Sequence, residues 1–116
     1  MSLIEEKSMA FAIRVVRLYQ YLTSEKKEYV MSKQLLRSGT SIGANLAEAK
    51  YAMSRKDFLA KQYIALKEAA ETIYWLDLLY QTEYITENEY KSIYADANEL
   101  RKLLGASTKT IRDTPG

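Results

Sequence analysis

The sequence predicts an all-α fold: an antiparallel up-down-up-down four-helix bundle that assembles into a homo-oligomer. A single proline and four glycines among 116 residues are typical of long helices joined by few turns. Apolar residues recur at helical spacing in four successive segments. Two of these segments are apolar on more than one face, which is more than one isolated bundle can bury. We therefore expect copies of the chain to associate.

Length and composition narrow the range of functions. A chain of 116 residues has the size of one domain, and 47% hydrophobic with 28% charged residues is the balance of a globular protein. The absence of cysteine and histidine excludes disulfides, the usual tetrahedral zinc sites and catalysis by histidine or a Cys–His pair. We accordingly expect a protein that is not an enzyme and that needs no cofactor and no small-molecule substrate.

The same sequence gives an expected compartment. No segment contains the run of about 18 apolar residues that a membrane-spanning helix needs. Residues 1–7 are acidic and lack the apolar region of a secretory signal. We therefore expect a cytoplasmic protein with no membrane contact.

The first helix is expected over residues 5–22, where Phe11, Val15, Leu18 and Leu22 form one apolar stripe. Residues 23–28 then reverse the chain. Ser24 is the candidate cap of a second helix over residues 27–51.

The second helix carries the most distinctive pattern. At about 100° per residue, five polar side chains fall on one line, and a row of small or apolar residues lies on the far side. The polar line is Gln34, Arg37, Ser41, Asn45 and Glu48, and the small-residue row is Leu36, Gly39, Gly43 and Ala47. Glycine costs a helix interior about 1 kcal/mol relative to alanine, so the row indicates that another backbone comes close. We assign this row to the oligomer interface.

The third helix is expected to follow Ser54, a candidate N-cap, and to end near residue 81. Opposite its core stripe lies a second apolar stripe of Ile64, Trp75, Leu78 and Leu79, from which we assign Ile64, Trp75 and Leu78 to the oligomer interface. Glu68 and Glu71 are interleaved with that stripe. These two carboxylates are candidate partners for Arg37 in a polar network, and a lysine or tyrosine is the expected partner of Glu48.

The fourth helix begins at a capping box, because Thr86 and Glu89 have the S/T-x-x-E spacing. Apolar residues keep a heptad spacing from Tyr90 to Leu104. Gly105 is a natural stop. We therefore expect residues 1–105 to form a single four-helix bundle domain and residues 106–116 to be a disordered tail.

The central stretch also carries a resemblance. It reads Gln34-x-x-Arg37-x-x-x-Ser41-Ile42-x-x-Asn45-Leu46-Ala47-Glu48. This pattern resembles the signature of the four-helix bundle proteins encoded in intervening sequences of bacterial 23S ribosomal RNA, called S23-like. The accessory variability protein of diversity-generating retroelements is a relative. The resemblance implies a barrel-shaped homopentamer, and through that relative an association with RNA or a nucleic-acid-processing protein.

The polar line admits two interpretations. It could form a binding groove or active centre, or it could be a hydrogen-bond network inside the bundle or between subunits. We favour the network, because a buried arginine or glutamate must find a partner. A more remote alternative is a metal-dependent hydrolase that uses carboxylates alone. The di-iron sites of helical bundles use histidine, which this chain lacks.

Nucleic-acid contact is a further hypothesis. The chain has ten tyrosines, whose rings can stack on bases. Its net charge is only +2, but five copies would carry about +10. The candidate contacts are Arg14, Arg17, Lys26, Lys27, Arg55 and Lys56. The leading interpretation is a non-enzymatic oligomeric scaffold or nucleic-acid-associated module with RNA binding. The alternative is a protein–protein adaptor with no nucleic-acid contact.

Overall fold

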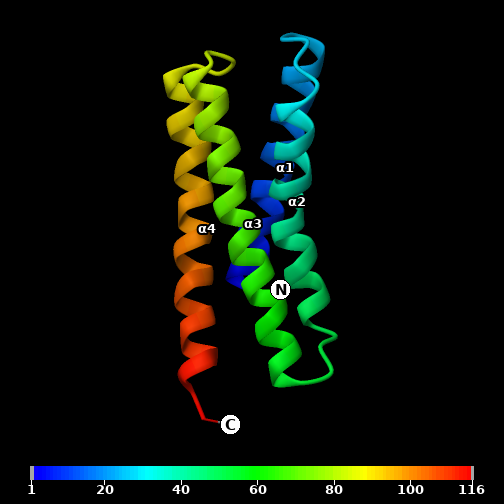
Figure 1. Ribbon diagram of the computed structural model, residues 1–116, viewed down its shortest axis with the longest axis vertical. Helices are drawn as coiled ribbons and strands as arrows, with labels where there is room; N and C mark the ends of the chain where they lie inside the picture. Colours follow the sequence, from blue (N-terminus) through cyan, green and yellow to red (C-terminus); the bar gives the residue numbers. More distant parts are fainter. Residues whose placement is uncertain (1, 116) are drawn as a thin grey trace.

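A computed structural model describes residues 2–115, which form four helices and no strand. The helices are α1 (Leu3–Ser24), α2 (Met31–Ala49), α3 (Arg55–Gln81) and α4 (Glu87–Asp113). Each runs antiparallel to the one before it, so the predicted four-helix, all-α fold is confirmed (Figure 1). The bundle is a rod with extents of 50 × 22 × 21 Å. No helix among the described residues is long and apolar enough to cross a membrane.

The core follows the apolar stripe predicted for the first helix. Phe11, Val15 and Leu22 of α1 are buried, and they meet Leu35, Ile42 and Leu46 of α2 together with the inner faces of the other two helices. Side chains one and two turns apart on each helix therefore point to the same axis, as period 3.6 requires.

The start of α2 differs from the prediction. Ser24 belongs to the end of α1, and α2 begins at Met31 rather than near residue 27. The side chain of Glu28 does the capping: its carboxylate accepts hydrogen bonds from the backbone N–H groups of Val30, Met31 and Ser32 at 3.0, 2.9 and 2.7 Å. A glutamate two residues before the N-cap position was missed because cap rules consider only short polar side chains.

The buried Glu28 stays charged. Burial raises the pKa of its carboxyl, but the backbone N–H donors outweigh burial and hold the pKa below its ordinary value. The unpaired N–H groups of the first turn of α2 thus find an anion, which is the charge that a helix N-terminus favours.

The small-residue row of α2 faces α1 of the same chain. Gly39 is buried against Val15, and a Cβ atom on Gly39 would lie 2.7 and 2.8 Å from the two Val15 methyl carbons. A Cβ atom on Gly43 would lie 3.2 Å from Ser8 Oγ. Gly39 is therefore buried within its own chain and offers no surface to a second copy, whereas Gly43 is half-buried and its assignment to the oligomer interface stays a prediction. Another backbone does come close, as the glycines indicated, but it is that of α1.

The fourth helix does not stop at Gly105. It continues to Asp113, so the predicted disorder is wrong for residues 106–113, and Gly116 lies outside the described residues. Thr108 is buried on this extension. Arg55, at the start of α3, donates from Nη2 to the carbonyl oxygens of Ile111, at 2.7 Å, and Thr114. The last turns of α4 thus pack against the first turns of α3, and a mid-helix glycine is tolerated.

Replacing Gly39 and replacing Gly105 should change the stability of the fold in opposite directions. Replacing Gly39 with alanine should destabilise the fold by about 1–3 kcal/mol, because the buried, β-branched Val15 cannot move aside. Replacing Gly105 with alanine should stabilise it by about 0.5–1 kcal/mol, since nothing lies within 4 Å of the new methyl group. Urea unfolding followed by circular dichroism measures both, and equal effects would contradict the close α1–α2 packing.

Candidate functional site: the Arg37 cluster and the α1–α4 pocket

The polar line of α2 meets α3 through Arg37. Arg37 Nη1 donates to Glu68 Oε2 at 2.9 Å, and Arg37 Nη2 donates to Glu71 Oε2. The same Glu71 oxygen accepts the indole N–H of Trp75 at 3.0 Å. We call these four residues the Arg37 cluster. The structure brings together the arginine and the two glutamates that the sequence suggested as partners.

The Arg37 cluster lies at the surface of the α2–α3 contact. The side chain of Arg37 is 48% exposed, whereas that of Glu68 is 15% exposed. The indole N–H and then the guanidinium hold the pKa of Glu71 below its ordinary value, against the effect of burial. The arrangement is a satisfied ion-pair network rather than a vacant anion or cation site.

The rest of the polar line bonds mostly within its own helix. Ser41 Oγ donates to the carbonyl of Arg37 at 2.5 Å, and Asn45 Nδ2 donates to the carbonyl of Ser41 at 2.8 Å. Glu48 pairs with Lys61 of α3 at 3.0 Å, and Gln34 is half-buried one turn before Arg37. These contacts are of the kind that helix packing makes, and none of them is a nucleophile–base pair.

One buried polar pair was not anticipated. Thr72 Oγ1 of α3 donates to Ser38 Oγ of α2 at 3.0 Å, and both side chains are fully buried. The sequence does place Ser38 beside the core stripe of α2. A serine within a helix is usually taken to weaken the helix, so its hydrogen bond to a buried residue of another helix was not predicted.

The carboxylates of α3 do not form a metal site. No group of three or more acidic side chains within residues 2–115 has the geometry to hold a metal ion. Glu68 and Glu71, the two acidic residues of the predicted polar network, both pair with Arg37.

The remaining residues assigned to an oligomer interface differ in exposure. Ile64 is 41% exposed and Ala47 is exposed. Leu36 and Trp75 are half-buried and pack against the core, and Leu78 is also half-buried. Of the third-helix stripe, only Ile64 offers a large apolar surface to solvent.

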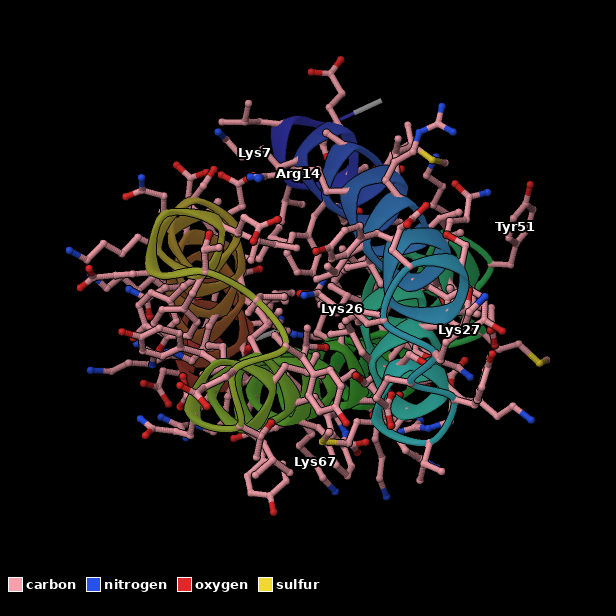
Figure 2. The ribbon with its side chains drawn as sticks, turned by 90° about the horizontal axis from the view of Figure 1, so that it is seen from above. Lys7, Arg14, Lys26, Lys27, Tyr51 and Lys67 are labelled. Atoms are coloured by element: carbon pink, nitrogen blue, oxygen red, sulfur yellow. The ribbon has the colours of Figure 1, made fainter. Side chains whose placement is uncertain are left out.

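The candidate nucleic-acid contacts do not form one patch on a single chain. Lys26 and Lys27 lie at the connection between α1 and α2, at one end of the rod (Figure 2). Arg55 and Lys56 begin α3 at the opposite end. Arg14 is paired with Asp96 at 2.7 Å, and Arg17 lies exposed on α1 between the two ends.

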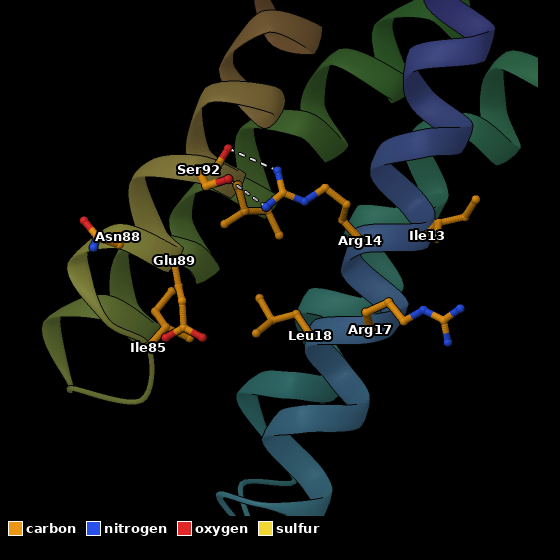
Figure 3. Close-up of a pocket in the computed structure, with 9 residues that line it drawn as sticks. Ile13, Arg14, Arg17, Leu18, Ile85, Asn88, Glu89 and Ser92 are labelled. Atoms are coloured by element: carbon orange, nitrogen blue, oxygen red, sulfur yellow. Dashed lines mark hydrogen bonds between the residues drawn. The ribbon is translucent and has the colours of Figure 1, made fainter.

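An apolar hollow lies between α1 and α4. It has a volume of about 540 Å³, within the range of ligand pockets, and its apolar lining residues are Ile13, Leu18, Ile85 and Ile93. Arg14 reaches across it: Nη2 donates to Ser92 Oγ at 2.9 Å and Nη1 to the Ser92 carbonyl at 3.2 Å (Figure 3). Arg17 points away from this α1–α4 pocket and Glu89 points toward it. The α1–α4 side is the least tightly packed face of the bundle.

Comparison with known proteins identifies the family. Residues 2–106 match the family described as 23S rRNA-intervening sequence protein. The chain belongs to that family. The crystal structure of a protein with unknown function from the S23 ribosomal protein family of Bacteroides thetaiotaomicron VPI-5482 superposes with a TM-score of 0.92. The two sequences are 58% identical over 93% of this chain and 100% of that one. No curated protein matches.

The stretch from Gln34 to Glu48 carries the sequence pattern that resembles the 23S rRNA-intervening sequence protein family. It includes Arg37, the residue of the Arg37 cluster that lies on α2. Its contacts explain the pattern physically: Arg37 and Glu48 join α2 to α3, Ser41 and Asn45 bond within α2, and the glycines admit α1. The distinctive motif of this chain is therefore accounted for by packing within one bundle.

Trp75 is the only tryptophan and should report the ionisation of Glu71. Because the folded pKa of Glu71 is lowered, its stabilising contribution is present above the ordinary value of about 4.5 and is lost as the pH falls through the folded value. We expect a change in Trp75 fluorescence centred below pH 4.5 while the chain remains helical. Since Arg37 is half exposed, its removal should cost only about 0.5 kcal/mol.

The Glu71→Gln variant should abolish this fluorescence transition, because glutamine keeps the shape but does not titrate. Glu87→Gln, on the exposed start of α4, is the matched control and should leave the transition in place. A transition that persists in Glu71→Gln would show that another group controls the indole.

Proposed function

We propose that the chain acts without catalysis, as a self-associating helical scaffold in the cytoplasm. The outward face of α3 is the observation that carries this proposal. Between residues 57 and 81, its exposed positions are two alanines, a glutamine and Tyr63, Ile64, Lys67 and Tyr74, so that one residue alone is charged. Lys67 points outward from α3 in Figure 2. A helix face this poor in charge is typical of a surface that another protein covers.

A second copy of the chain is the proposed partner of the α3 face. Tyr63, Ile64 and Tyr74 are 38%, 41% and 58% exposed, which gives rigid aromatic and aliphatic contacts of the kind that dominate interfaces. The resemblance to S23-like proteins favours a homopentamer as the order of assembly. Cyclic association of this type uses two different faces of each subunit and closes on itself.

The non-enzymatic part of the proposal is supported by the chemistry of the side chains. The sequence offers no histidine and no cysteine. The polar line, which was the one candidate active centre, bonds to its own helix and to α3. Every buried side-chain nitrogen and oxygen among residues 2–115 has a hydrogen-bond partner, so no polar group waits there for a substrate.

RNA binding by the assembled scaffold is the second candidate function. Arg17, Lys26, Lys27 and Lys56 form no ion pair with any carboxylate among the described residues. Lys26 and Lys27 share one connection, so a ring of subunits would repeat this pair around one rim. Repeated cations of this kind release counterions from a phosphate backbone, which drives salt-dependent binding. A protein–protein adaptor remains the alternative if no RNA is bound.

Sedimentation velocity tests the self-association. The wild-type chain should sediment as an oligomer, and Ile64→Glu combined with Tyr74→Glu should shift it toward the monomer, because two buried charges would have no partners. Tyr51→Glu is the matched control: Tyr51 is 85% exposed and lies between α2 and α3, off the α3 face. A wild-type monomer at high concentration would overturn the proposal.

Fluorescence anisotropy with a structured RNA tests the second candidate. Lys26→Ala with Lys27→Ala should weaken binding and lower the slope of log K against log salt by about 0.9 for each phosphate that is no longer neutralised. The control removes the same charge elsewhere, with Lys102→Ala and Lys109→Ala on α4. Absence of binding at low salt, or an equal weakening in both variants, would count against RNA contact by the Lys26–Lys27 connection.

A further inference from the structure

A second hollow opens at the end of the bundle where α3 turns into α4. It has a volume of about 310 Å³, and its walls include the rings of Tyr21, Tyr80 and Tyr84. Ile85 and Glu89 line both this hollow and the α1–α4 pocket, so the two spaces are neighbours. We call the second space the tyrosine hollow.

The charges around the tyrosine hollow favour a cation. Glu83 and Glu89 line it, and Lys26 is the one cationic side chain there. Glu83 forms no ion pair with any described residue, and Glu89 uses Oε1 to accept the Thr86 backbone N–H at 2.8 Å. The face of the Tyr21 ring carries negative partial charge and acts in the same direction as the two carboxylates, whereas Tyr90 stacks on one face of Tyr80 with ring centroids 4.5 Å apart.

A cation of the chain itself already lies at the edge of the hollow. Lys26 Nζ is 5.9 Å from the centroid of the Tyr21 ring, within the range of a cation–π contact. Lys26 is exposed and its ammonium group is strongly hydrated, so it can leave without breaking a buried contact.

Glu83 is held in an unusual backbone conformation that places it at this site. Its φ is +67°, in the left-handed region that favours glycine. Its N–H donates to the Tyr80 carbonyl and that of Tyr84 donates to the Leu79 carbonyl, at 3.0 and 2.9 Å. A glycine would serve the turn better, so the glutamate side chain brings a charge to the hollow at a cost to the fold.

We propose that the tyrosine hollow binds an organic cation of the quaternary ammonium class. The methylated head lies among the tyrosine rings beside Glu83 and Glu89, and displaces the Lys26 ammonium. A methylated nitrogen fits better than a primary amine because it loses less hydration when it contacts aromatic rings. An apolar substituent on that nitrogen extends past Ile85 toward Leu18 in the α1–α4 pocket. This site is independent of the proposed scaffold and RNA functions.

Isothermal titration of the full-length chain tests the proposal with matched probes. Choline should bind about tenfold more tightly than 3,3-dimethylbutan-1-ol, which has the same shape but carbon in place of the charged nitrogen. Benzyltrimethylammonium should bind more tightly than tetramethylammonium, because its ring reaches the α1–α4 pocket. Leu18→Ala should reduce the advantage of the benzyl group without changing the binding of tetramethylammonium.

Glu83→Gly separates the binding role from a structural one. This variant should weaken choline binding by about threefold or more while raising the urea midpoint, because glycine relieves the left-handed strain. Glu83→Gln should weaken binding equally without that gain in stability.

Lys26→Met should strengthen choline binding, since the internal competitor is removed. Tyr51→Leu, outside the hollow, should leave choline binding unchanged. Equal binding of choline and its neutral isostere, or full affinity in Glu83→Gly, would overturn the proposal.

Discussion

The close approach of α1 and α2 is the constraint on which the rest of the bundle depends. It requires a residue without a side chain opposite Val15, and Gly39 supplies it. The remaining members of the small-residue row also face α1, but Gly43 is half-buried and Ala47 is exposed. The polar line then turns toward α3, where Arg37 finds Glu68 and Glu71. One steric requirement therefore fixes both the packing on one side of α2 and the electrostatics on the other.

Much of the fold could be predicted from the sequence, because apolar residues at helical spacing and capping residues indicate where the helices lie. The apolar stripes of α1 and α4, the capping box at Thr86 and Glu89, and the cap at Ser54 appear where the sequence placed them. The start of α2 could not be predicted, since Glu28 caps it from outside the usual position with a longer side chain. The end of α4 was misjudged because a glycine was taken as a stop, whereas contacts with α3 sustain the helix beyond it.

The candidate sites show a sharper limit of sequence reasoning. A pattern identifies which residues share a helix face, but it does not say which neighbour that face meets. The row through Gly39 and Gly43 was correctly read as a site of close approach, yet its partner proved to be α1. The tyrosine hollow could not be anticipated at all. Its walls come from α1, α3 and the α3–α4 connection, and only the folded chain brings these segments to one place.

The ion pairs between α1 and α4 bear on how the bundle forms and opens. Three of its helix–helix contacts join neighbours in sequence, and only the α1–α4 contact joins the two distant ends of the chain. Two half-exposed ion pairs, Lys7–Glu99 and Arg14–Asp96 at 3.0 and 2.7 Å, lie along the surface of that contact. Contacts between helices that are neighbours in sequence form fastest, so the α1–α4 contact should form last during folding of the bundle. Local opening of the native state should likewise begin at the α1–α4 contact, and backbone amide exchange should be fastest there.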